Sequence, residues 1–201
     1  MDRIIAITGN ICTGKSAVGN ILAKVGATVV SHDTFLYGAY AEPKCQEEIV
    51  ACFGAAILVN GLIDRTSLKT YLKEHPEDCR RLWNITDKYS DPLVERFFQE
   101  NRSLTFFECA PLYERSWDRF CEQVIACYVP DDLRIIRLIE RARTRDGFYL
   151  SEKEAIAVMN QQEMSQEEKI KRADYVIYND GNLESLERQT ITLYHQIMKQ
   201  K

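Results

Sequence analysis

The 201-residue chain lacks several features that mark large classes of protein. It contains no run of 18 apolar residues, so we expect no helix that spans a membrane. Basic residues do not outnumber acidic ones (26 against 30, net charge −4), which argues against non-specific binding to nucleic acid or to an anionic membrane. The start of the chain leads directly into an apolar strand at Arg3–Thr8 and does not resemble a signal peptide. We therefore expect a cytoplasmic protein that binds neither nucleic acid nor membranes.

Cysteine and histidine are present but form no metal or disulfide pattern. The seven cysteines are an odd number and include no Cys-x-x-Cys pair, whereas small secreted proteins usually carry an even number. His32, His75 and His195 lie far apart in the sequence, and no zinc ligand set is visible. We expect mostly buried thiols in a reducing compartment.

Five short apolar segments predict the strands of a parallel β-sheet. Residues 3–8 and 27–31 flank a segment, 16–25, whose apolar residues recur with helical spacing. Strand, helix and strand in this order are typical of a βαβ unit, and such units imply parallel strands. The other predicted strands cover residues 104–108, 124–129 and 175–178. The sequence therefore predicts an α/β fold, a three-layer α/β/α sandwich.

Two long stretches outside these strands are predicted to be helical. Residues 33–101 are too long for a simple crossover, so we expect a helical insertion over one end of the sheet, with breaks near Gly54, Gly61, Pro76 and Pro92. Residues 131–172 are unusually charged and are interrupted at Gly147, which makes them a candidate mobile lid. No repeat or linker is visible, so we expect a single domain over residues 1–201.

The most specific motif is Gly9-Asn-Ile-Cys-Thr-Gly-Lys-Ser16, which matches the P-loop pattern between a predicted strand and a predicted helix. In such a loop, backbone N–H groups and the helix N-terminus surround the phosphates of a nucleotide. Lys15 would reach the β- and γ-phosphates, and the Ser16 hydroxyl would ligate Mg²⁺. The predicted nucleotide-binding residues are Gly9, Asn10, Ile11, Cys12, Thr13, Gly14, Lys15 and Ser16. The alternative is a glycine turn that only joins strand to helix.

The class of P-loop protein is narrowed by what is missing. The sequence has neither the Asn-Lys-x-Asp motif that binds guanine nor the Asp-x-x-Gly switch of GTPases. Glu108 ends the apolar segment Leu104–Glu108 and fits the acidic residue that assists Mg²⁺ in many P-loop proteins, but a solvated strand end would look the same.

Asp33 follows the second predicted strand, at the sheet edge where the P-loop is also expected. A carboxylate there can accept the proton of an attacking hydroxyl or help to hold Mg²⁺. The alternative is an N-cap for a helix that begins at Thr34. Position alone does not separate these interpretations.

Arginines are concentrated in the candidate lid. Arg137, Arg141 and Arg145 are spaced by four residues and would share one face of an α-helix. Phosphoryl transfer develops negative charge that such arginines can stabilise, but a solvated face paired with Glu140 and Asp146 is the alternative. A later basic cluster, Lys169, Lys171 and Arg172, is expected at the surface.

Several further segments match the motifs of one family in the same order along the chain. They are Val29-Val-Ser-His-Asp33, Phe53-Gly54 through Gly61-Leu-Ile-Asp-Arg65, Pro111-Leu112 with Glu114, Arg141-Ala-Arg-Thr-Arg-Asp-Gly147, and Glu167-Glu-Lys169 with Ala173-Asp-Tyr-Val-Ile-Tyr-Asn-Asp-Gly181. Together with the P-loop, they resemble dephospho-CoA kinases over essentially the whole chain. The P-loop is shared by many families, whereas the last three segments in this order are far more specific.

The resemblance implies a P-loop kinase fold, with ATP and Mg²⁺ as cofactors, and phosphorylation of the ribose 3′-hydroxyl of dephospho-CoA in the last step of CoA biosynthesis. Asp33 would be the catalytic base and would contact the acceptor, while Lys15, Arg141 and Arg145 would stabilise the transferred phosphate. Asn179 would lie near the adenine, and Arg65 toward dephospho-CoA.

The chain departs from the family pattern mainly on the acceptor side, at Ser31, Tyr37, Asp91 and either Val158 or Met159. The lid can also be aligned with Arg137 in the place given above to Arg141. Two other functions therefore stay open: a related kinase with another nucleoside or nucleotide acceptor, and a paralogue that binds nucleotide without transferring phosphate. We expect a monomer or a weak homo-oligomer. The helix N-terminus could also lower the pKa of Cys12 and make this thiol sensitive to alkylation.

Overall fold

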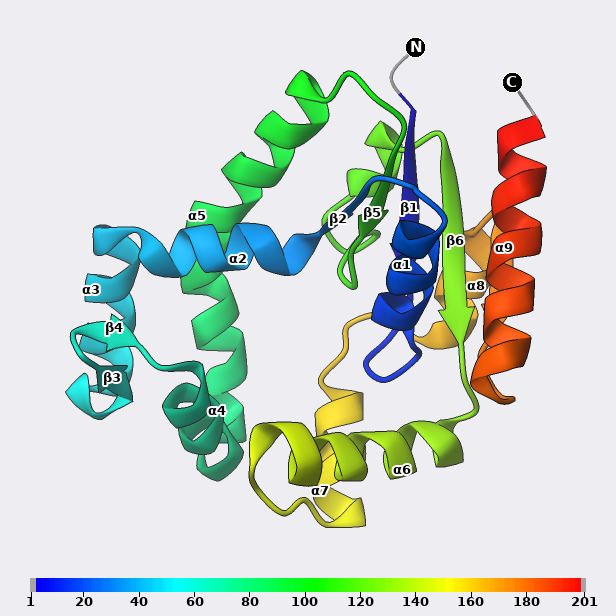
Figure 1. The fold of residues 1–201 in the computed structure, drawn as a ribbon. Helices are drawn as coiled ribbons and strands as arrows, with labels where there is room; N and C mark the ends of the chain where they lie inside the picture. Colours follow the sequence, from blue (N-terminus) through cyan, green and yellow to red (C-terminus); the bar gives the residue numbers. More distant parts are fainter. Residues whose placement is uncertain (1–2, 200–201) are drawn as a thin grey trace. The chain divides into compact units, whose positions relative to one another are not determined.

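The computed structural model, which describes residues 3–199, contains a five-stranded parallel sheet (Figure 1). The strand order is β2-β5-β1-β6-β7, and every pair of neighbours is parallel. The bounds are β1 Ile4–Thr8, β2 Val29–Ser31, β5 Thr105–Glu108, β6 Gln123–Tyr128 and β7 Tyr175–Tyr178. The five predicted strands are confirmed, each within two residues of its expected bounds. The predicted α/β fold with a parallel sheet is confirmed with them.

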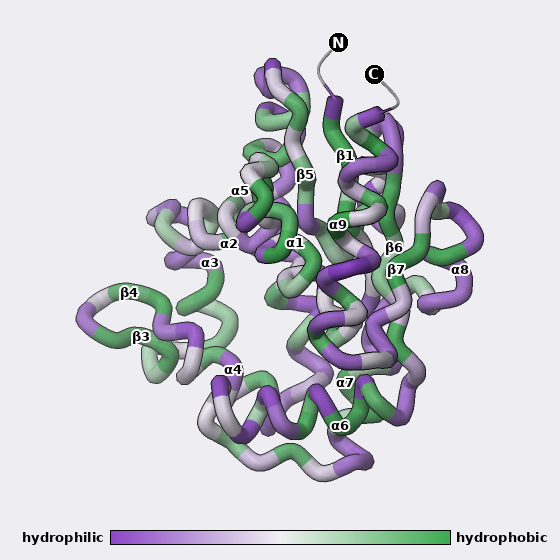
Figure 2. The backbone as a smooth tube through the Cα atoms, turned by 45° about the vertical axis from the view of Figure 1, so that its right-hand side comes forward, coloured by the Kyte–Doolittle hydropathy of each residue, from purple (hydrophilic) through white to green (hydrophobic). Residues whose placement is uncertain are grey.

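Helices cover the sheet, because parallel strands bury both of their faces. In Figure 1, α1 (Lys15–Lys24) and α9 (Leu183–Lys199) lie in front of the sheet, and α8 (Gln166–Arg172) lies behind it. All five residues of β1 are buried, and Figure 2 shows hydrophobic colouring along β1 and β6. The core between the sheet, α1 and α9 contains Ile5, Ile7, Val18, Leu22, Phe106, Ile125, Ile177, Leu186 and Ile197. This core holds the ends of β1 and α1, and therefore the loop between them, in place.

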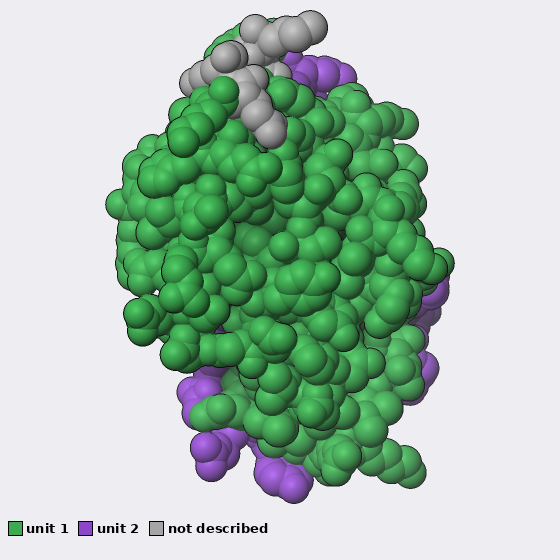
Figure 3. All heavy atoms as spheres, turned by 90° about the vertical axis from the view of Figure 1, so that its right-hand side faces the viewer, with its two compact units in different colours: residues 1–31, 101–141, 150–201 green, residues 32–100, 142–149 purple. Residues whose placement is uncertain are grey.

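The chain divides into two compact units, coloured separately in Figure 3. Unit 1 comprises residues 1–31, 101–141 and 150–201 and contains the five-stranded sheet. Unit 2 comprises residues 32–100 and 142–149. The stretch predicted as a lid contributes to both: α6 (Asp131–Arg141) and α7 (Glu152–Asn160) belong to unit 1, and the residues between them to unit 2.

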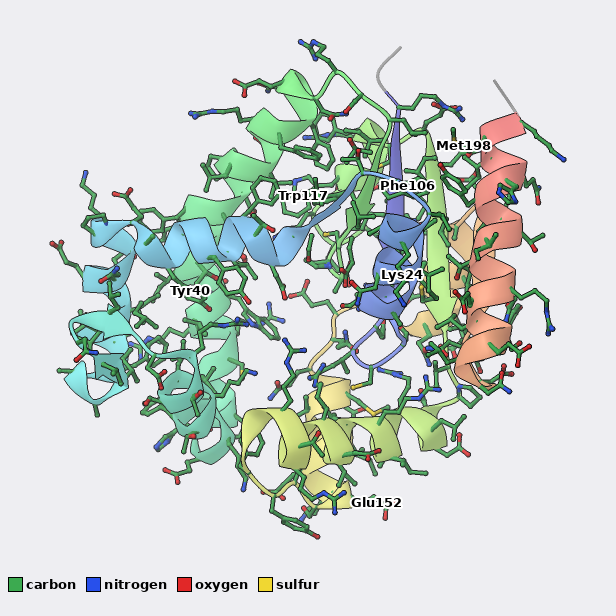
Figure 4. The ribbon with its side chains drawn as sticks, viewed as in Figure 1. Lys24, Tyr40, Phe106, Trp117, Glu152 and Met198 are labelled. Atoms are coloured by element: carbon green, nitrogen blue, oxygen red, sulfur yellow. The ribbon has the colours of Figure 1, made fainter. Side chains whose placement is uncertain are left out.

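Unit 2 is mainly helical and has its own core. Its α-helices are α2 His32–Ala41, α3 Pro43–Phe53, α4 Arg65–Glu74 and α5 Cys79–Glu100, with short 3₁₀ turns at Ala55–Ile57 and Pro76–Asp78. The core contains Cys45, Ile49, Phe53, Ile57, Leu68, Leu82 and Ile85. Tyr40, near the end of α2 and labelled in Figure 4, packs against this core. A hydrophobic cluster of this kind explains why the segment folds as a unit.

Two local features of unit 2 differ from the sequence-based expectation. The predicted break at Pro92 is wrong, because α5 continues through this residue. Apolar side chains such as Leu82 and Phe98 bury one face of α5 on both sides of Pro92, so packing outweighs the missing hydrogen bond. In addition, β3 (Leu58–Val59) and β4 (Leu62–Ile63) form an antiparallel hairpin in a stretch expected to be helical.

No helix among residues 3–199 combines the length and the hydropathy that crossing a membrane would require.

Candidate nucleotide-binding site

The loop between β1 and α1 passes so close to neighbouring atoms that two of its positions admit only glycine. Gly9 has a φ of +144°, and a Cβ there would lie 2.6 Å from the carbonyl oxygen of Cys127. Gly14 has a φ of +93°, and a Cβ there would lie 2.1 Å from Nδ2 of Asn179. Both glycines of the predicted P-loop are therefore required by backbone conformation and by packing.

Lys15 begins α1 and turns back over the loop. Its Nζ donates to the carbonyl oxygen of Asn10 at 3.1 Å. No side chain caps α1 at Gly14, and its first turn contains no acidic residue, so the positive N-terminal end of the helix is available to an anion. Burial lowers the pKa of Lys15, since the charged form is poorly solvated there. A bound phosphate would relieve that cost.

Glu108 ends β5, the strand beside β1, and faces the first turn of α1. The hydroxyl of Ser16 donates to Oε1 of Glu108 at 2.6 Å. Glu108 is therefore engaged by the P-loop serine and does not simply end a solvated strand. A hydroxyl and a carboxylate are hard oxygen ligands of the type that Mg²⁺ prefers, so the pair fits this ion.

Three arginines of α6 act on the P-loop together with Lys15. Arg141, Lys15, Arg134 and Arg137, in decreasing order, each favour the thiolate form of Cys12, but burial outweighs them and raises the pKa of this thiol. The expectation of a lowered Cys12 pKa is therefore wrong, because desolvation exceeds the effect of the charges. Both candidate arginines of the lid alignment, Arg137 and Arg141, contribute positive potential at the loop.

Arg145 differs from the other two arginines of the predicted row. The α-helix ends at Arg141, and residues Ala142–Asp146 form a π-helical turn in unit 2. Because a π-turn bonds residue i to i+5, the face that carries Arg137 and Arg141 does not continue with α-helical spacing to Arg145. The prediction of one shared helical face is wrong at this position, where the arginine side chain is exposed.

Two residues that the sequence-based interpretation did not single out hold the P-loop from outside. Arg134 is buried, and its Nε donates to the carbonyl oxygen of Ile11 at 3.1 Å. Oε1 of Gln162 accepts from the N–H of Ile11 at 3.0 Å and from Nη2 of Arg134 at 3.0 Å. No local pattern indicates this role, since the three residues are brought together only by the fold.

Asn179 contacts the loop, and Lys169 lies in α8. The side chain of Asn179 donates to the carbonyl oxygen of Thr13 at 3.1 Å and contacts Gly14. Its role near the adenine stays a prediction. The expectation that Lys169 lies at the surface is wrong: its side chain is 1% exposed and forms an ion pair with Glu114 at 2.8 Å. Lys171 and Arg172 are exposed, as expected.

The acceptor-side candidates lie together in unit 2. The N-cap interpretation of Asp33 is wrong, because α2 begins at His32 and Asp33 is its second residue. Arg65, the first residue of α4, donates to the Tyr37 hydroxyl and places its guanidinium 4.5 Å from the centre of that ring. Burial raises the pKa of Tyr40 to about 12, opposed by the charge of Arg65 and reinforced by that of Asp33. Asp33 and Arg65 therefore both act electrostatically on Tyr40.

The remaining departures from the family pattern lie within regular strands and helices. Ser31 ends β2 and pairs with Glu108 across the β2–β5 ladder. Asp91 lies within α5, and Val158 is half-buried in α7.

The parallel sheet of order 2-5-1-6-7, the P-loop between β1 and α1, and the Ser16–Glu108 pair define a kinase of the P-loop class. A family model described as dephospho-CoA kinase matches residues 3–185. The chain belongs to the dephospho-CoA kinase family, and it is a kinase that uses ATP.

Relatives and solved structures agree with this assignment. A dephospho-CoA kinase of Listeria monocytogenes is 31% identical to this chain over 208 aligned residues. The alignment covers 100% of both proteins. The structure of the dephospho-CoA kinase from Campylobacter jejuni is similar with a TM-score of 0.67 and 25% identity, covering 99% of this chain and 98% of the other. A shikimate kinase from Acinetobacter baumannii, with a TM-score of 0.55, 14% identity and coverage of 99% and 94%, shares the fold.

Proposed function

We propose that this protein transfers the γ-phosphoryl group of ATP to the ribose 3′-hydroxyl of dephospho-CoA, which yields CoA in the last step of its biosynthesis. The observation that carries the proposal is the match to dephospho-CoA kinases along the whole chain. The P-loop geometry and the cations around it support the same reaction, since phosphoryl transfer depends on positioning and on charge stabilisation.

On the nucleotide side, the backbone of the loop and Lys15 bind the phosphates. Arg141 and Arg137 supply positive charge near the loop, where negative charge develops during transfer. Arg145 is proposed to join them. Ser16 and Glu108 would hold Mg²⁺, which neutralises charge on the β- and γ-phosphates when it is bound.

On the acceptor side, Asp33 accepts the proton of the attacking hydroxyl, and Arg65 binds the acceptor. A carboxylate that removes this proton as the new P–O bond forms prevents positive charge from building on the attacking oxygen. The shared electrostatic environment of Asp33 and Arg65 at Tyr40 supports a common role in unit 2.

A coupled assay of ADP release with Mg·ATP, run with and without dephospho-CoA, tests the proposed function. We expect release that depends on dephospho-CoA, with CoA identified as the product by mass spectrometry. Substitution of the acceptor by other nucleosides and nucleotides serves as the control. Turnover of one of these instead of dephospho-CoA would replace the proposed acceptor. ATP binding without any turnover would indicate a binding-only paralogue.

The role of Asp33 predicts a separation of binding from catalysis. An Asp33→Ala or Asp33→Asn variant should lose about 10²-fold or more in kcat, which is the usual contribution of a general base, while its affinity for ATP stays near wild type. Steady-state kinetics and calorimetry measure the two quantities. Turnover that barely changes would exclude Asp33 as the base.

The protein is proposed to act in the cytoplasm, which is reducing, because all seven cysteines are free thiols. Its proposed partners are the small molecules ATP and dephospho-CoA. The proposed oligomeric state is a monomer or a weak homo-oligomer.

A further inference from the structure

The backbone at Ile11, the third residue of the P-loop, is held on both sides by two side chains from outside the loop. Arg134 donates from Nε to the carbonyl oxygen of Ile11, and the N–H of Ile11 donates to Oε1 of Gln162. A third bond, from Nη2 of Arg134 to the same Oε1, closes the triangle. We propose that Arg134 and Gln162, named here the Ile11 clamp, are positioning residues that set the conformation of the P-loop for nucleotide binding. The inference rests on the proposed function only in taking ATP as the nucleotide.

The burial of Arg134 is the first reason to assign it more than a packing role. Its side chain is 4% exposed, whereas its carboxylate partner Asp131, at 2.7 Å from Nη1, is 66% exposed. A buried charge is costly unless hydrogen bonds satisfy it, and an apolar residue of similar size often packs equally well. Leu138, the other buried residue of α6, shows that the helix already packs with an apolar side chain one turn further on. The guanidinium at position 134 therefore serves the oxygen atoms that it binds.

The conformation of Cys12 is the second reason. Cys12 follows Ile11 directly and has a φ of +62°, a left-handed conformation that is unfavourable for a residue with a side chain. Such residues persist where the surrounding structure over-determines them, and they cluster at ligand sites. The clamp fixes the peptide groups just before Cys12, so it can maintain this conformation. Residues 13–16 follow in the same loop, and backbone N–H groups of a P-loop surround the phosphates.

The segment that carries Gln162 is itself fixed to unit 1, so the clamp has a rigid support. Nδ2 of Asn10 donates to the carbonyl oxygen of Met164 at 3.1 Å. Gln166 exchanges hydrogen bonds with both backbone groups of Val129, at 3.4 and 3.0 Å, just after β6. Residues 162–166 thus join the first half of the P-loop to the end of a central strand. Pre-organisation of this kind increases affinity because less order has to be imposed when the ligand binds.

Calorimetric ATP affinity of clamp variants is the test, since it needs no turnover. Arg134→Met and Gln162→Met should each raise the Kd for ATP about tenfold, the scale expected for losing a charge-assisted hydrogen bond. Because both act through Ile11, the double variant should lose clearly less than the product of the two single losses. Gln162→Glu keeps an acceptor for both donors and should stay within about threefold of wild type. Arg188→Met, at an exposed arginine of α9, is the matched control and should bind as wild type does.

If Arg134 and Gln162 only stabilised the fold, the kinetic constants of their variants would change in a different way. The clamp predicts a higher KM for ATP with kcat changed less than about threefold, whereas partial unfolding lowers kcat and leaves the KM of the remaining folded enzyme unchanged. If Arg134→Met does not fold, the comparison of Gln162→Met with Gln162→Glu decides. ATP affinities within twofold of wild type in both methionine variants would overturn the proposal. A wild-type protein that binds ATP without phosphorylating dephospho-CoA would overturn the proposed function but not the clamp.

Discussion

At the P-loop, burial and nearby charges have opposite effects on the pKa of individual residues. Lys15 lies between opposing influences: burial lowers its pKa, and the carboxylate of Glu108 is among the groups that raise it. Cys12 shows the same competition, because three arginines and Lys15 favour its thiolate while burial prevails. In both cases several positive charges lie in a poorly solvated place, and an anionic ligand bound there would be stabilised by them.

The lowered pKa of Lys15 predicts a pH dependence of ATP binding. Only the protonated amine attracts phosphate, so affinity should fall as the pH rises through the pKa of Lys15 in the free protein, which burial lowers from its ordinary value. Calorimetry between pH 7 and pH 9.5 measures the loss. A Lys15→Arg variant keeps its charge throughout and should show no such alkaline loss, whatever its absolute affinity. A wild-type affinity that stays constant over this range would contradict the prediction.

Packing overrides local preference in α5, whereas the hairpin of β3 and β4 follows it. Helix α5 passes through Pro92, an exposed residue that cannot donate to the carbonyl oxygen of Lys88. The hairpin of β3 and β4 turns at Asn60 and Gly61, which have φ values of +54° and +77°. Asn-Gly is the most specific signal for a two-residue hairpin, so this turn could have been predicted from the sequence.

Pro92→Ala should stabilise the protein. Alanine restores one helical hydrogen bond and removes a clash, a gain of about 3 kcal/mol in an ideal helix. The greater freedom of the unfolded chain offsets about 0.4–1 kcal/mol of it, so we expect a net increase of about 2 kcal/mol. Urea unfolding measures the difference. Arg96→Ala, an exposed substitution in the same helix, should stay within about 0.5 kcal/mol of wild type. A destabilised Pro92→Ala protein would mean that the backbone conformation imposed by the proline is needed for packing.

For the molecule as a whole, buried polar contacts join segments that are far apart in the sequence. Lys169 of α8 pairs with Glu114 and donates to the carbonyl oxygen of Ala110 at 2.6 Å. The hydroxyl of Thr8, the last residue of β1, donates to the same carbonyl at 3.2 Å. The ends of β1 and β5 and one covering helix are thereby tied together beside the P-loop.

Loss of the Lys169 ammonium should destabilise the protein strongly. Lys169→Met leaves the carboxylate of Glu114, whose side chain is 11% exposed, without its partner, and breaking a buried ion pair in this way costs about 3–5 kcal/mol. The double variant Lys169→Met/Glu114→Gln removes both charges and should recover part of the loss. Urea unfolding of the three proteins gives the comparison. A single variant within about 1 kcal/mol of wild type would show that the pair contributes little.

Features that depend on a few consecutive residues followed directly from the sequence. The strand Ile4–Thr8 is an apolar β-branched run, and the P-loop is a backbone conformation imposed by Gly9 and Gly14 at a fixed spacing. Such patterns act over short distances, so they hold in any tertiary context that buries them. The class of fold, the phosphate-binding loop and the family were determined in this way.

The tertiary structure decided which polar and charged groups meet. Ser16 bonds Glu108 across 92 positions of the chain, and Ile11 bonds Gln162 across 151. Lys169 became buried and Arg134 reached the P-loop for the same reason: both depend on how the loops and helices pack around the sheet. A single residue type at one position carries no information about a partner so distant, because the contact exists only when the intervening chain has folded.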